Sequence, residues 1–172
     1  MTNRGVLLKL LMDKLGVDPQ LGTFRNRLVL QKSVYLLQAL GMPTAFGYNW
    51  YLRGPYSPAL TAAAFEEVVK PLEQGDDTPS GYTLSRETED RLDKLQGMKD
   101  QADKAGLAPE KWLELLASIH FYKHKMYFPP EKQVDKNNAE ALYGHMPPAK
   151  RHAFTAKQAE QAAAALNAAD AW

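Results

Sequence analysis

His120 and His124 are the residues of this sequence whose type and spacing come closest to a metal site. They stand four residues apart in a segment expected to be helical, so both imidazoles would lie on one face and could share an ion. The residues between them include no glutamate, so the base of the zinc-protease signature is missing. A third ligand would have to come from His145, His152 or a distant carboxylate. We expect two exposed helix residues and predict no metal site and no cofactor, leaving zinc binding by this pair as an open question.

Ser57 is the serine whose neighbours most invite a catalytic interpretation. It lies in the run Gly-Pro-Tyr-Ser-Pro and not in the Gly-x-Ser-x-Gly pattern of an activated nucleophile. Pro58 also lacks the backbone N–H that would complete an oxyanion hole, whereas Ser followed by Pro is typical of the start of a helix. Asp76 and Asp77 form a pair of acids in a loop, which is usually solvated. We therefore predict no catalytic residues and a protein that is not an enzyme.

Composition excludes further classes of chemistry. The 172 residues contain no cysteine, which rules out a thiol nucleophile, a disulfide scaffold and a thiolate metal site. There are 21 Lys and Arg against 20 Asp and Glu, so the net charge is +1, which argues against binding nucleic acid mainly through bulk positive charge. Charges interrupt the apolar start of the chain well before the length of a membrane span, and no signal-peptide cleavage site follows. We expect a cytoplasmic protein without a membrane segment.

The elements that would position these residues are mostly helices. Hydrophobic spacing, helix caps and breakers predict helices over about 7–15, 23–40, 59–69, 86–105, 110–126, 138–143 and 156–169. The helix over 23–40 is apolar around most of its circumference, which predicts a central, buried element. The aromatic run 46–52 is expected to be extended, 53–56 to be a tight turn, and 82–84 to be a short strand.

This order of elements predicts a mainly α (α+β) fold: a winged-helix-like helical domain with a small β-hairpin and additional C-terminal helices. Residues 82–84 would form the outer strand of the wing. Residues 1–105 would form the core, and residues 106–172 a C-terminal helical extension packed on it within a single domain. In a winged helix that reads DNA, the third helix enters the major groove. Here that helix would carry Glu66 and Glu67 beside Lys70, and such carboxylates disfavour phosphate contact.

The aromatic segment before that helix is the richest candidate binding surface. Tyr, Trp and Arg dominate the energetics of protein interfaces. The segment combines them, and a basic stretch of the 23–40 helix is expected to lie beside it. The predicted partner-binding residues are Tyr48, Trp50, Arg53, Tyr56, Arg25 and Arg27. The alternative is that most of these rings pack into the core.

Two stretches carry a resemblance to a known group of proteins. Residues 30–38 read LQKSVYLLQ and residues 50–60 read WYLRGPYSPAL. In these stretches the chain resembles the Panacea antitoxin domain and the related SocA-like and YwgA-like bacterial proteins, over about residues 24–70. The resemblance implies a small helical protein that binds another protein, such as a toxin, an effector or a protease. It implies structural roles for Leu30 and Tyr35 in the core and for Ser57 as a cap, and it transfers no catalytic residue.

The function expected from the sequence is therefore that of a non-catalytic protein-interaction module, antitoxin-like or associated with phage defence. The alternative is a winged-helix DNA-binding transcriptional regulator, with an enzyme third. The sequence leaves the identity of the partner and the oligomeric state open.

Overall fold

The computed structural model describes all 172 residues and shows a mainly helical chain with one two-stranded antiparallel hairpin. The helices are α1 (Asn3–Leu15), α2 (Phe24–Ala39), α3 (Pro58–Ala64), α4 (Lys70–Glu73), α5 (Arg86–Lys99), α6 (Pro109–His124), α7 (Ala139–Gly144), α8 (Pro148–Ala153) and α9 (Ala156–Ala168). The strands are β1 (Asn49–Tyr51) and β2 (Gly54–Tyr56). The predicted fold class, mainly α with a small hairpin, is confirmed. No helix combines the length and the apolar character that a membrane span requires.

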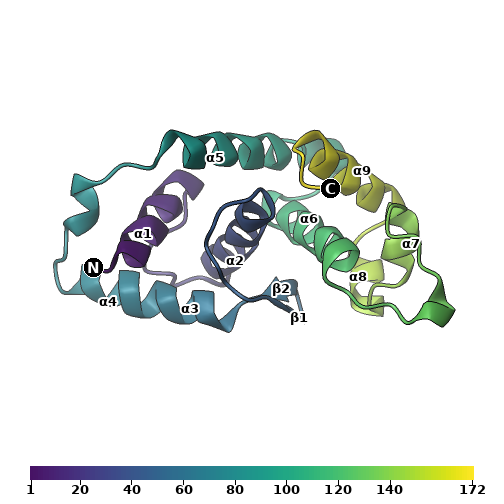
Figure 1. Ribbon diagram of the computed structural model, residues 1–172, viewed down its shortest axis with the longest axis horizontal. Coiled ribbons are helices and arrows are strands. Elements are labelled where there is room, and N and C mark those ends of the chain that lie inside the picture. Colours follow the sequence, from purple (N-terminus) through teal and green to yellow (C-terminus); the bar gives the residue numbers. More distant parts are fainter.

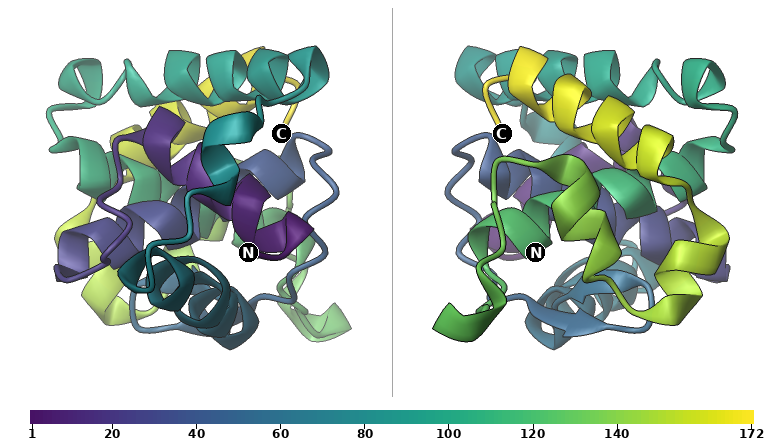
Figure 2. Two further views of the ribbon diagram at one scale, coloured as in Figure 1. Left: turned by 90° about the vertical axis from the view of Figure 1, so that its left-hand side faces the viewer. Right: turned by 90° about the vertical axis from the view of Figure 1, so that its right-hand side faces the viewer.

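The helices form layers around α2 and α6. Helix α5 runs along one side of the molecule, while α3, α4 and the hairpin lie along the opposite side, with α1, α2 and α6 between them (Figures 1 and 2). Helix α9 crosses α6 next to α5, and α7 packs against α9. Helix α2 packs against α6 and touches α1, α3, α5 and β2, so it is the central element that its apolar circumference predicts.

Polar side chains start most of the helices at the expected places. Thr2, Thr23, Ser57, Ser85, Asn138 and Thr155 each accept a hydrogen bond from a backbone N–H of the first turn. Ser57 is thus the helix cap that the Ser-Pro pair indicates, and Pro58 occupies the first turn of α3. Thr155 and Gln158 form the reciprocal capping box that starts α9.

The structure corrects several of the predicted elements. Residues 82–84 form no strand, so the hairpin stands between α2 and α3 and no wing follows the third helix. Residues 53–56 are not a turn by themselves: Leu52 and Arg53 make the reversal, and Gly54–Tyr56 is the second strand. The expected break between 144 and 148 is followed at once by α8, which is an additional short helix.

The helix that begins at Ser57 continues past Lys70 and Pro71, where the sequence predicts its end. A π-helical turn over Phe65–Val69 leads directly into α4. Pro71 has no backbone N–H and therefore cannot donate the helical hydrogen bond to the carbonyl of Glu67, four residues earlier. Gly5 of α1 packs against this same carbonyl. A Cβ at Gly5 would lie 2.3 Å from the Glu67 oxygen, so only glycine allows the contact.

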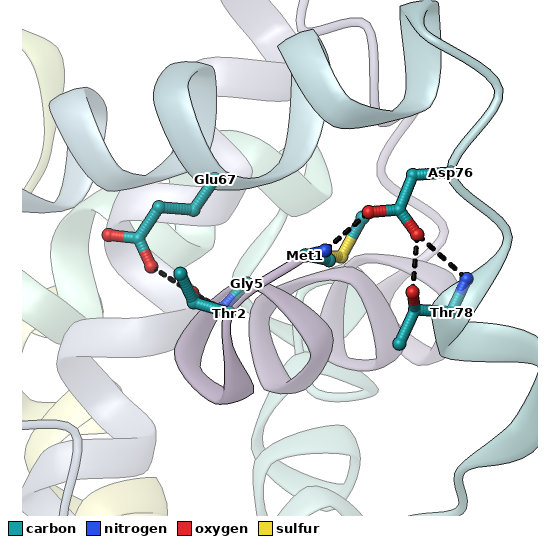
Figure 3. Close-up of polar contacts among 6 residues, drawn as sticks. All are labelled: Met1, Thr2, Gly5, Glu67, Asp76 and Thr78. Carbon is teal, nitrogen blue, oxygen red and sulfur yellow. Dashed lines mark hydrogen bonds and ion pairs between the residues drawn. The ribbon is translucent and has the colours of Figure 1, made fainter.

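A polar cluster at the N-terminus fastens α1 to this helix and to the loop that follows it (Figure 3). The Thr2 hydroxyl donates to the Glu67 carboxylate and accepts from the Gly5 N–H, and the Met1 ammonium pairs with Asp76. Asp76 also accepts from the Thr78 backbone, and the hydrogen bond from the Met1 ammonium, followed by those from Thr78, lowers the Asp76 pKa to about 2. Every acid in the cluster has a partner within the chain, which gives it a structural role.

Candidate functional site

Gln31 and Lys32, adjacent residues of α2, hold the chain where it leaves the hairpin. The Gln31 amide donates to the Ser57 carbonyl oxygen at 2.8 Å, and its own oxygen accepts from the Ser57 N–H at 2.9 Å. The Lys32 ammonium donates to the Pro55 carbonyl oxygen at 2.6 Å. All of these contacts are buried, so they fix the hairpin on α2. Residues 30–38 and residues 50–60 are therefore joined by hydrogen bonds.

Gly54 lets the second strand lie directly on α6. Its φ of 87° is in the left-handed region, and a Cβ at this position would lie 2.5 Å from the Ser118 hydroxyl oxygen. Strands β1 and β2 pair with Asn49 opposite Tyr56 and Tyr51 opposite Gly54. With β2 packed closely on α6, the two residues of the reversal, Leu52 and Arg53, project into solvent.

A groove lies between the start of α2, the hairpin and the start of α3. It encloses about 290 Å³ and is mostly apolar. Its lining residues are Phe24, Arg27, Leu28, Gln31, Lys32, Tyr51, Leu52, Arg53, Gly54, Tyr56 and Thr61. Three of its large hydrophobic side chains are unusually open to solvent: Phe24 is 57% exposed, Tyr51 60% and Leu52 78%. Apolar side chains gathered in this way are typical of a binding surface.

The charged residues that line this groove are all basic. They are Arg27, Lys32 and Arg53, and no carboxylate lines it. The Arg53 guanidinium stands 5.7 Å above the Phe24 ring and 3.5 Å from the Glu114 carboxylate, yet its side chain is still half exposed. Arg27 donates one N–H to the Leu21 carbonyl oxygen at 2.7 Å. Both arginines are therefore held in place beside the apolar surface.

Charged groups are also buried beneath the hairpin. Glu114 of α6 pairs with Lys150 of α8, and both side chains are almost completely enclosed. Burial lowers the pKa of Lys32 to about 7, the nearby Lys150 ammonium adds to this, and Glu114 opposes it. Burial also lowers the pKa of Lys150, while its hydrogen bond to Glu114 acts in the opposite direction. Lys32 is thus a buried residue, unlike the neighbouring arginines of α2, of which Arg25 is exposed and Arg27 partly exposed.

The six predicted partner-binding residues fall into three groups. Arg53, Tyr56 and Arg27 line the groove, and Arg25 lies outside it, exposed and paired with Glu110 at 3.6 Å. Tyr48 and Trp50 turn toward the interior instead, where their rings contact Tyr35 of α2 and Tyr122 of α6.

The most exposed groove residues are absent from the predicted set. Phe24 follows the Thr23 cap in the outer first turn of α2, and Leu52 is at the tip of the hairpin. The position of each residue in the sequence could have identified it: Phe24 directly follows a helix cap, and Leu52 lies in the reversal of a hairpin, and both are places where a large apolar side chain is left exposed. Gln31 and Lys32 are buried by their contacts with the hairpin and with Ser57, and no neighbouring residue in the sequence indicates that they are buried.

A second cavity, of about 310 Å³, lies beside His120 and His124. His120 is buried, contrary to the expectation of an exposed residue, and its Nδ1 is 2.7 Å from the Tyr35 hydroxyl. The two imidazole centroids are 4.4 Å apart. Burial lowers the pKa of His120 to about 3, so the ring is neutral at pH 7. No group of three or more His, Cys, Asp or Glu side chains is placed to hold a metal ion.

The fold and the groove define a small helical protein with a solvent-open groove lined by apolar and basic side chains. No protein-family model matches the chain, and no curated protein or solved structure matches it.

Proposed function

We propose that this protein is a non-catalytic interaction module, antitoxin-like or associated with phage defence, that binds a partner protein such as a toxin or effector in the cytoplasm. The observation that carries the proposal is the grouping of Phe24, Tyr51 and Leu52 around one groove, each more than half exposed. The resemblance of residues 24–70 to antitoxin domains gives the class of partner.

The groove has the chemistry of a protein-binding hot spot. Aromatic and arginine side chains supply most of the binding energy at protein interfaces when a partner covers them. The Tyr51 and Tyr56 rings pack in a tilted arrangement with centroids 5.6 Å apart, and Arg53 lies over Phe24, so these side chains are held in place before a partner arrives. Such preorganisation reduces the entropy cost of binding.

A DNA-binding regulator is supported less well. The helix after the hairpin is the one that would enter the major groove, and its Lys70 is neutralised by Glu66 at 2.6 Å. Glu67 on the same helix is engaged by Arg4 and Thr2. This surface offers no free cation to phosphate, and the basic residues lie around the groove instead.

The test is a neutralisation assay with the product of the adjacent gene. We expect expression of that gene alone to arrest growth, co-expression of the wild-type chain to restore it, and the substitution Leu52→Asp to abolish the rescue. Tyr127→Asp is the matched control, because Tyr127 is equally exposed, at 78%, and lies outside the groove. Equal rescue by the wild type and by a folded Leu52→Asp variant would remove the groove from the function. Failure of any chain to bind or neutralise the product would count against the antitoxin role.

A further inference from the structure

We infer that the groove beside the hairpin binds an extended acidic segment of the partner that carries an apolar anchor side chain. The inference rests on the proposed function and specifies the chemistry of the occupant. It starts from the sign of the charges: the two arginines that line the groove, Arg27 and Arg53, are positive, Lys32 is buried at its base, and no carboxylate lines it.

The apolar part of the groove determines the anchor. Phe24, Tyr51 and Leu52 leave hydrophobic surface exposed, and a volume of about 290 Å³ can hold only a few side chains. Covering this surface with a leucine or aromatic side chain removes apolar area from water on both partners. The reversal at Leu52 and Arg53 then lies against the neighbouring residues of the bound segment.

The two arginines determine the acidic flanks. The Arg53 guanidinium is only partly satisfied, because its nearest carboxylate, Glu114, lies at 3.5 Å and is itself bound to Lys150. The side chain remains half exposed and faces the groove. Arg27 uses one of its N–H groups on the Leu21 carbonyl, which leaves others for a ligand. Guanidinium groups fixed in this way favour carboxylates through paired hydrogen bonds.

A nucleic acid is the competing polyanion, and the surroundings of the groove favour a peptide. Of the other basic residues near the groove, Arg25 is paired with Glu110 and Lys111 lies 4.0 Å from Glu114, so the basic surface does not extend into a track for a phosphate backbone.

The experiment is a selection of random peptides of about ten residues on the immobilised full-length protein. We expect enrichment of Leu, Phe or Tyr flanked by Asp and Glu, and we expect no such enrichment on the Leu52→Asp variant. On the Arg27→Gln/Arg53→Gln variant the acidic preference should disappear, and a selected acidic peptide should bind at least about tenfold more weakly. Arg86→Gln is the matched control, because Arg86 is an exposed arginine of α5 on the opposite side of the molecule, and it should change neither.

Each other outcome identifies a different occupant or none. Enriched peptides that are neutral or basic, or no enrichment above the Leu52→Asp background, would overturn the inference. Binding of a single-stranded oligonucleotide of about 20 nucleotides that is lost in the arginine variant would assign the groove to nucleic acid. A wild-type dimer in sedimentation experiments that Leu52→Asp converts to a monomer would assign it to a second copy of the chain. Thermal unfolding of each variant verifies the fold, and Arg27→Gln alone replaces the double variant if that variant is unfolded.

The inference and the proposed function can fail separately. Neutralisation of a toxin that persists without any preference for acidic peptides would leave the function standing and remove only the chemistry of the bound segment. Acidic peptides selected by the groove without neutralisation would do the reverse.

Discussion

Lys32 is an amine buried beneath the hairpin whose charge state depends on the fold. In the folded protein its pKa is lowered to about 7, from an ordinary value of 10.5, mainly because burial disfavours the ammonium form. Its hydrogen bond to the Pro55 carbonyl keeps it at the base of the groove. A group that binds its proton less tightly in the folded state than in the unfolded state makes stability depend on pH.

Lys32 should make the protein more stable as the pH rises from about 7 to about 9. In this range the unfolded chain keeps the Lys32 proton and the folded chain releases it, so unfolding takes up a proton and becomes less favourable. The contribution is roughly 2 kcal/mol between these two pH values and is complete only above the unfolded pKa of 10.5. Denaturant unfolding at several pH values measures it.

The substitution Lys32→Met isolates this effect from other titrations. The free-energy difference between wild type and variant should change by that amount over the range, whereas Lys132→Met, an exposed lysine, should leave the pH profile unchanged. The range ends near pH 9 because burial raises the pKa of Tyr35 above its ordinary 10.0, which lowers stability at higher pH. Parallel profiles for the wild type and Lys32→Met would contradict the assignment.

Gly54→Ala should destabilise the protein by about 3 kcal/mol, since it adds a methyl group both at a left-handed backbone position and against Ser118. Gly106→Ala is the control for the backbone alone, because Gly106 is left-handed with open space around it, and should cost about 1 kcal/mol. The Ser118 hydroxyl is buried and has no hydrogen-bond partner, so Ser118→Ala should cost little. Combined with Gly54→Ala it should recover the steric part, as chemical denaturation would show. Equal losses for Gly54→Ala and Gly106→Ala would exclude the contact.

Local residue roles are predictable from the sequence, and long-range ones are not. Ser57 is identified as a cap by its neighbours, and the burial of Leu30 and Tyr35 agrees with their predicted core roles. The burial of Lys32 depends on a carbonyl 23 residues away, and no nearby residue indicates it. The groove is hidden from the sequence for the same reason, since Phe24 and Tyr51 meet only after α2 and the hairpin have packed together.

Secondary-structure elements, like single residues, are predictable from the sequence where local signals decide them and are not where long-range contacts do. Helices with clear caps and apolar spacing, such as α2 and α9, are predicted nearly to their ends. The helix through Pro71 is not, because a proline normally stops a helix, and here the π-helical turn and the contact with Gly5 accommodate it. Helix α8 is only six residues long, and it is held by a tertiary contact, the pair between Lys150 and Glu114.

Removing only one member of the Glu114–Lys150 pair should strongly destabilise the protein. Glu114→Gln or Lys150→Met should each cost about 3 kcal/mol, because either leaves a buried charge without its principal partner. The double substitution should cost clearly less than the sum, since both charges are then absent. Urea unfolding of the four proteins gives the coupling energy. Lys157→Met, an exposed lysine of α9, is the control. Additive losses would mean that the two groups stabilise the fold independently.

The molecule as a whole is organised around a helix from its second half. Helix α6 has eleven buried residues among its sixteen, and it packs against α2, β2 and α9. One core cluster contains Leu36 of α2, Leu113 of α6 and Leu166 of α9. The hairpin that forms the groove therefore rests on both the first 105 residues and the remainder of the chain.

A fragment of residues 1–105 should consequently fail to fold cooperatively. Without α6, α2 loses the helix that it contacts most extensively and β2 loses the helix that it rests on, and burial of apolar surface is the main source of stability. We expect the fragment to bind a hydrophobic dye, to lack a near-ultraviolet circular dichroism signal, and to unfold without a sigmoidal transition. Co-expression with residues 106–172 should restore all three properties by rebuilding the shared core. A fragment that unfolds in a single cooperative transition by itself would show instead that residues 1–105 are an independent domain and that the remaining helices only cover it.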